Sequence, residues 1–126
     1  MTLGEYFEST AGVGVLGTSD AEGLVDAAIY ARPHVIDEET IALIMADRRS
    51  HRNLQANPRA VYLFKEEGSY RGRRLYLMKT KEEKDSPLIA EIRRRKSSDV
   101  EGRDGDGTKF LVWFRIVRIR PLIGGE

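Results

Sequence analysis

The chain has 126 residues, no cysteine, and a formal net charge of +1 from 21 basic and 20 acidic side chains. This length suits a single domain over residues 1–126 with its own hydrophobic core. The balanced charge gives no overall field that would attract nucleic acid or a membrane surface. The absence of cysteine excludes disulfides, thiolate metal ligands and a cysteine nucleophile.

No apolar stretch approaches the roughly 20 residues of a membrane-spanning helix. The N-terminal sequence MTLGEYFEST lacks the basic and apolar regions of a signal peptide. We therefore expect a soluble, cytoplasmic protein.

Three short helices are predicted. Thr2 precedes the first helix with the spacing of a capping box. The second helix follows the basic turn, where Asp47 or Ser50 can act as the cap, and it ends before Pro58. The third helix begins at Pro87, because proline suits the first position of a helix.

Six strands are predicted from β-type residues between polar turns, with Pro33 marking the end of the second or an irregularity in it. The connections of the first three strands are too short for crossover helices, which predicts antiparallel pairing. A closed or nearly closed antiparallel barrel buries the apolar side chains and removes sheet edges, so the fold class is mainly β with short helices. The predicted strands cover residues 13–18, 24–31, 40–46, 60–65, 73–79 and 110–119.

The last predicted strand is apolar on both of its faces. A strand of this kind is buried twice, once by the core and once by a second partner. The simplest cover for the second face is another subunit. The two alternating sets are Phe110, Val112, Phe114 and Ile116, and Leu111, Trp113, Arg115 and Val117.

Gly12, Gly14 and Gly17 have the G-x-G-x-x-G spacing of the dinucleotide fingerprint. That fingerprint requires a strand before it and a helix after it. Here a predicted helix precedes the glycines and another strand follows. We therefore predict that the glycines lie in a strand and allow close packing.

The basic turn of Asp47, Arg48, Arg49 and Ser50 enters the second helix. A helix start offers unpaired N–H groups and a partial positive charge, and guanidinium and hydroxyl groups add donors. This combination suits a phosphate group. The alternative is a solvated pair of arginines with Ser50 acting only as a cap.

Small residues lie in the middle of the second predicted strand, at Ala27 and Ala28. They leave room for a flat ligand against the backbone, or for close packing by the first helix. No catalytic constellation and no set of three metal ligands is present, since His34 and His51 lack a third partner. Any chemistry must then be carried by a bound cofactor.

The order of these parts resembles the FMN-binding split barrels related to pyridoxamine 5′-phosphate oxidase. The resemblance begins at LGEYFE, runs through the turn SDAEGL, and is clearest in IALIMADRRSHRNLQANPRAVYLF, residues 41–64. It implies a six-stranded antiparallel split β-barrel that binds FMN, as a homodimer with the flavin between subunits. The residues it implies for the flavin phosphate are Arg49 and Ser50; for the ring and ribityl chain Asp26, Ala27, Ala28 and Ile29; and for the flavin edge the backbone of Asp47 and Arg48.

This resemblance implies a flavin-dependent oxidoreductase or electron carrier. It does not imply oxidation of pyridoxamine phosphate, because residues 26–29 replace the arginine and lysine of the oxidase pattern and the Arg-x-His ending is missing. Two alternatives remain. The same barrel could bind a deazaflavin or haem, or the chain could be a non-enzymatic interaction module that binds nucleic acid through residues 71–74 and 93–96.

Overall fold

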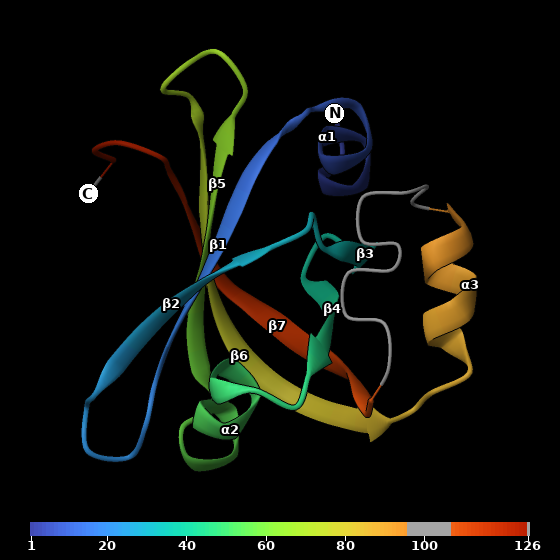
Figure 1. Ribbon diagram of the computed structural model, residues 1–126. Helices are drawn as coiled ribbons and strands as arrows, with labels where there is room; N and C mark the ends of the chain where they lie inside the picture. Colours follow the sequence, from blue (N-terminus) through green and yellow to red (C-terminus); the bar gives the residue numbers. More distant parts are fainter. Residues whose placement is uncertain (96–106, 126) are drawn as a thin grey trace.

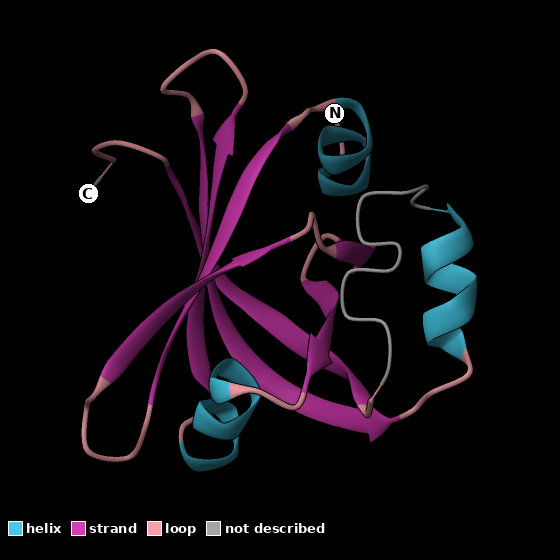
Figure 2. Cartoon of the chain, in the orientation of Figure 1, coloured by secondary structure: helices cyan, strands magenta, loops and turns pink. Residues whose placement is uncertain are grey.

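The computed structural model describes residues 1–95 and 107–125. Within these ranges the chain forms one sheet of seven strands and three short helices (Figures 1 and 2). In chain order the elements are α1 (Leu3–Ser9), β1 (Gly12–Ser19), β2 (Val25–Tyr30), β3 (His34–Asp37), β4 (Thr40–Ala46), α2 (Arg49–Ala56), β5 (Arg59–Glu66), β6 (Gly72–Lys84), α3 (Leu88–Arg95) and β7 (Lys109–Pro121).

The strands lie in the order β2-β1-β5-β6-β7-β4-β3, and every neighbouring pair is antiparallel. The two edge strands, β2 and β3, are joined by residues 31–33 alone. A link of this length spans at most about 14 Å. The edges of the sheet must therefore approach each other at this link, and the sheet curls into a split barrel. The predicted antiparallel barrel is confirmed.

The prediction of six strands was one too few. After Pro33 the chain moves to the other edge of the sheet and forms β3, which pairs with β4. The predicted strand at residues 40–46 thus lies between β3 and β7, away from β2. The strand β6 also continues beyond its predicted end at residue 79 to Lys84, through an irregularity between Lys79 and Lys81.

The main core lies inside the curled sheet, and α1 and α2 lie at opposite ends of it (Figure 1). The predicted capping box of α1 is present, since Thr2 Oγ1 accepts from the Glu5 backbone N–H at 3.1 Å. This helix packs Phe7 edge-to-face against Phe64 at 5.2 Å. The fully buried members of the core include Leu3, Leu16, Ile41, Met45, Leu54, Tyr62, Phe64, Leu75, Val112 and Phe114.

A second cluster covers the outer face of β4 and β7. The helix α3 places Ile89 and Ile92 against Leu111, and all three are buried. The prediction that a partner subunit covers the outer face of β7 is therefore wrong for the part of the strand around Leu111. The chain's own helix α3 covers that part. Farther along the strand, Val117 and Ile119 are exposed.

The glycines of β1 allow close packing, as predicted. A Cβ atom at Gly14 would collide with Tyr62 Oη, which donates a hydrogen bond to the Ala31 carbonyl at 3.0 Å. At Gly12 a Cβ atom would collide with the Lys65 carbonyl. The strand β1 follows α1 and leads into β2, which is not the strand–turn–helix order of a dinucleotide site. None of the helices in the described ranges is long and apolar enough to cross a bilayer.

We expect Gly14→Ala to destabilise the protein by about 2 kcal/mol, because the added methyl group must displace the Tyr62 ring from the Ala31 carbonyl. Urea unfolding measures the change. The matched control is Gly4→Ala in α1, where the nearest contact of a Cβ atom is an ordinary 3.8 Å. That variant should be neutral or more stable. Equal stability of Gly14→Ala and the wild type would contradict the packing argument.

Candidate functional site

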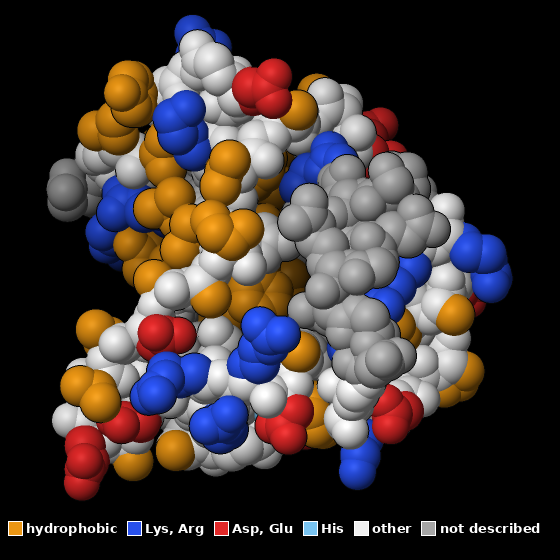
Figure 3. Space-filling view, viewed as in Figure 1, with side chains coloured by type: hydrophobic (Ala, Val, Ile, Leu, Met, Phe, Trp, Pro, Cys, Tyr) orange, Lys and Arg blue, Asp and Glu red, His pale blue; other side chains and the backbone are white. Residues whose placement is uncertain are grey.

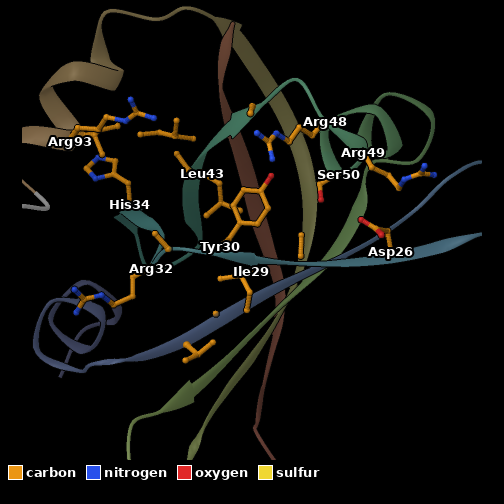
Figure 4. A pocket seen from close by; sticks show the side chains of 18 of the residues that line it. Asp26, Ile29, Tyr30, Arg32, His34, Leu43, Arg48, Arg49, Ser50 and Arg93 are labelled. Carbon is orange, nitrogen blue, oxygen red and sulfur yellow. The ribbon is translucent and has the colours of Figure 1, made fainter. Parts of the chain in front are cut away.

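A cleft of about 710 Å³ opens between β1, β2, β4 and the start of α2 (Figure 4). Its volume lies within the range of small-molecule sites, which is roughly 300–1,000 Å³. The space-filling view shows a hollow with hydrophobic side chains near the middle of this face (Figure 3). Backbone and side chains of Gly12, Val13, Gly14, Ala28, Ile29, Tyr30, Leu43 and Ile44 form much of its apolar lining.

Most of the predicted site residues line this cleft, and two do not. Ala27 does not line the cleft, whereas Asp26, Ala28 and Ile29 of the same strand do. The side chain of Asp47 is 64% exposed and lies outside the lining. The predicted residues that the cleft does bring together are Asp26, Ala28, Ile29, Arg48, Arg49 and Ser50.

The start of α2 forms one end of the cleft. Arg48 is the N-cap in extended backbone, and no side chain caps the helix. The predicted caps, Asp47 and Ser50, are therefore wrong. An uncapped helix start leaves N–H groups that can donate hydrogen bonds to an anion.

Two side chains add donors to this helix start. Ser50 is only 4% exposed, lines the cleft, and its hydroxyl group makes no hydrogen bond within the described ranges. Figure 4 shows Arg49 beside it, and Asp26 of β2 facing the same end of the cleft. The arginine favours an anion there, whereas the carboxylate opposes it.

Polar contacts hold α2 in place. Asn53 Nδ2 donates to Thr18 Oγ1 of β1 at 3.0 Å, and both side chains are buried. The imidazole of His51 stacks on the Phe110 ring of β7, with 3.7 Å between centroids and 13° between planes. Leu54 adds an apolar anchor in the main core. The donors at the helix start are thus fixed by the next turn of the same helix.

His51 also contacts β6 through Glu82. The distance from His51 Nε2 to Glu82 Oε2 is 3.0 Å, and Lys79 Nζ lies 2.8 Å from Glu82 Oε1. Burial raises the pKa of Glu82, but hydrogen bonds from Lys79, Gln55 and His51, together with the His51 charge, outweigh it and lower the pKa to about 2. The carboxylate is therefore ionised and accepts hydrogen bonds from all three side chains.

Several lining residues were not predicted from the sequence. Tyr30 continues the alternation of Asp26 and Ala28, so extending that period-two pattern to the end of β2 would have found it. His34 lies on the unpredicted strand β3, and Arg93 reaches the far end of the cleft from α3 (Figure 4). No local signal in the sequence brings these two residues together.

Arg32 also lines the cleft, but its guanidinium group serves the fold. Its Nη1 donates to the carbonyl groups of Phe7 and Thr10 at 3.0 and 3.1 Å, which fastens the end of α1. Across the described ranges, no three His, Asp or Glu side chains converge as a metal site. The cleft thus combines an apolar lining with charged side chains, among them Arg49 at the start of α2 and Arg93 of α3.

We expect Glu82→Gln to flatten the acid dependence of stability. Because folding lowers the pKa of Glu82 from 4.5 to about 2, its contribution is present above about pH 4.5 and is lost as the pH falls towards 2. The wild type should lose on the order of 2 kcal/mol more than the variant over this interval. Urea unfolding at several pH values measures the difference. Glu83→Gln, on the exposed neighbouring position, should behave like the wild type.

No protein-family model matches the chain, and none of the curated proteins matches its sequence. Solved structures do resemble it. An FMN-binding protein from Syntrophomonas wolfei superposes with a TM-score of 0.78 at 18% identity, over 96% of this chain and 84% of that one. An F420 reductase gives a TM-score of 0.73 at 14% identity, over 94% and 97% of the two chains.

HutZ, the haem storage protein from Vibrio cholerae, also shares the architecture. Its TM-score is 0.70 at 19% identity, with 94% of each chain covered. These likenesses extend over nearly the whole chain. The chain therefore has the split-barrel fold of the FMN-binding proteins related to pyridoxamine 5′-phosphate oxidase.

Proposed function

We propose that this protein binds FMN in the cleft, with the flavin phosphate at the start of α2, and acts as a flavin-dependent oxidoreductase or electron carrier. The observation that carries the proposal is the uncapped start of α2 at one end of a cleft of about 710 Å³. Arg48, Arg49 and Ser50 all line this end of the cleft. A phosphate dianion needs several donors at one point, and this turn supplies them.

The rest of the cleft suits the flat part of a flavin. The side chain of Ala28 is small, so β2 leaves space for a flat ring at this position. Tyr30 and Leu43 provide apolar surface beside it. Ligand sites of this kind combine an apolar lining with a few polar groups that fix orientation. The site residues would bind and orient the cofactor, and the bound flavin itself supplies the electron-transfer chemistry.

A homodimer is the second part of the proposal. The outer face of β1, β2 and β5 carries apolar side chains with no helix of the described chain over it (Figures 1 and 3). On it, Val13, Val25 and Ile29 are 53%, 77% and 72% exposed. Two of them, Val13 and Ile29, are also at the rim of the cleft. A second subunit on this face would bury the apolar patch and close the cleft.

Haem is the alternative ligand that one observation favours. The imidazole of His34 lies in the cleft, and a histidine nitrogen is a common haem ligand. HutZ, which shares the fold, is a haem storage protein. A deazaflavin would use the same anion-binding end as FMN, and the F420 reductase shares the fold. Absorption spectra after incubation with each ligand distinguish the three.

A nucleic-acid module has less support. Arg74 donates to the carbonyl groups of Pro121 and Gly124, and Arg73 lies over the Tyr6 ring at 3.8 Å, so these arginines make contacts inside the chain. Arg93 lines the cleft at the other side of the molecule, while residue 96 lies outside the described ranges. The two basic segments do not form one patch in the part of the chain that the structure describes.

We expect Arg49→Ala to weaken FMN binding by about tenfold to 100-fold, since it removes a charged donor to the phosphate. Riboflavin, which lacks the phosphate, should bind the wild type and the variant equally. Quenching of flavin fluorescence measures both affinities. Arg52→Ala is the matched control, because Arg52 is an exposed arginine of the same helix outside the cleft lining. Asp26→Asn should change FMN affinity in the opposite direction, by about threefold.

Equal loss of riboflavin and FMN binding in Arg49→Ala would contradict the phosphate assignment. Failure of the wild type to bind FMN at all would contradict the proposed function itself.

We expect Ile29→Lys to convert a dimer to a monomer, because it places a charge in the middle of the apolar outer face. Light scattering coupled to size-exclusion chromatography measures the mass. Leu88→Lys, at an exposed apolar position of α3, is the control and should leave the dimer intact. A wild-type monomer at micromolar concentration, or a dimeric Ile29→Lys variant, would rule out this interface.

A further inference from the structure

A buried histidine lies one residue after the anion-binding turn. His51 is the third residue of α2 and is 6% exposed. The partial positive charge of a helix start disfavours a cation at this position, and Arg48 and Arg49 are close to it in the same turn. A charged imidazole here therefore needs nearby negative charge.

The hydrogen bonds of the imidazole indicate which nitrogen carries the hydrogen of the neutral ring. Glu82 is ionised, so the Nε2 atom of His51, 3.0 Å from Glu82 Oε2, is a donor and keeps its hydrogen. The amide of Gln55 donates to the other carboxylate oxygen at 3.0 Å. The second proton of a charged His51 must then be on Nδ1. That atom is 4.0 Å from Asp47 Oδ1, which is longer than a hydrogen bond.

Few negative charges face the imidazole. On the β6 side, the imidazole contacts the Glu82 carboxylate, which also contacts Lys79. The exposed Lys84 lies two residues farther along the same face of β6. From β7 the stacked ring of Phe110 covers it, and the alternation of strand side chains places Lys109 on the other face.

Just before α2, Asp47 Oδ1 lies 4.0 Å from His51 Nδ1, and the side chain of Asp47 is 64% exposed. Arg48 precedes His51 by one helical turn, and Arg52 follows it directly. Positive charge thus exceeds negative charge around a protonated His51. An anion at the start of α2 would correct that excess.

We propose that the anion site at the start of α2 binds its anion together with a proton on His51 Nδ1, so that His51 is a positioning residue whose charge sets the affinity of the site. By thermodynamic reciprocity, a bound anion favours the charged imidazole as much as the charged imidazole favours the anion. This inference rests on the proposed anion site, but it does not require the ligand to be a flavin. A second observation supports an anion there, because Ser50 is only 4% exposed, lines the cleft, and directs a hydroxyl group with no hydrogen-bond partner among the described residues towards it.

The test uses sulfate as the probe, because its charge does not change between about pH 5 and about pH 8, where histidine side chains lose their proton. The shift of the Ser50 amide signal in NMR spectra reports binding. We expect the sulfate affinity of the wild type to fall about tenfold over this range. The affinity of His51→Gln should be nearly constant, because glutamine fills a similar position without a titrating proton. Arg52→Gln removes one positive charge from the same helix and should keep the pH dependence of the wild type.

A histidine that only holds the helix in place would give the same ratio of wild-type to His51→Gln affinity at every pH. That result would overturn the proposal, and so would the absence of any sulfate-dependent shift at Ser50. Should His51→Gln fail to fold, Glu82→Gln replaces it. Loss of the carboxylate removes the counter-ion of the imidazole, so the fall in affinity should move to lower pH, and an unchanged pH profile would overturn the coupling.

Titration with FMN, run beside sulfate, separates the two proposals. If FMN binds and the ratio of the wild-type affinity to the His51→Gln affinity is the same at every pH, the proposed function stands and the coupling is overturned. A pH-dependent sulfate site without FMN binding overturns the proposed flavin and supports the coupling.

Discussion

The fold depends on the closure of the sheet at residues 31–33. This short link joins the two edge strands, and the hydrogen bond from Tyr62 Oη to the Ala31 carbonyl fastens it to the middle of the sheet. The bond is possible only because Gly14 leaves room for the Tyr62 ring. Closure also places β2 opposite β4, and the cleft lies between them. The packing of one tyrosine against one glycine thus shapes the proposed ligand site.

The second determinant is the polar attachment of α2. An eight-residue helix is marginal by itself, and α2 contributes Leu54 to the main core. Its orientation therefore relies on Asn53 and His51, which connect it to β1 and β6. Buried polar contacts of this kind have directional geometry, which apolar packing lacks. They hold the donors of the helix start in fixed positions, at the cost of a buried ionisable group beside the site.

Local signals in the sequence were sufficient for most of the fold. The capping box at Thr2 and the end of α2 at Asn57 are encoded within a few residues, and both are confirmed. The strand β3 was missed because its four residues are exposed or half-buried and show no alternation. The cover of β7 by α3 was missed because it depends on which face a distant helix reaches.

The candidate site was only partly predictable for the same reason. The basic turn and the alternation along β2 are local patterns, and six of the eight predicted residues line the cleft. The pair of His51 and Glu82 joins residues 31 positions apart, which no local pattern indicates. Likewise, His34 and Arg93 reach the cleft from β3 and α3, and only the closed sheet brings these elements together.

The central claim is that the start of α2 holds the phosphate of a flavin. A crystal structure of the protein grown with FMN tests it most directly. The account requires the phosphate within hydrogen-bond distance of Arg49 and Ser50, with the ring against Ala28 and Tyr30. Electron density that places the phosphate elsewhere, or a cleft filled only with solvent at saturating FMN, would contradict it.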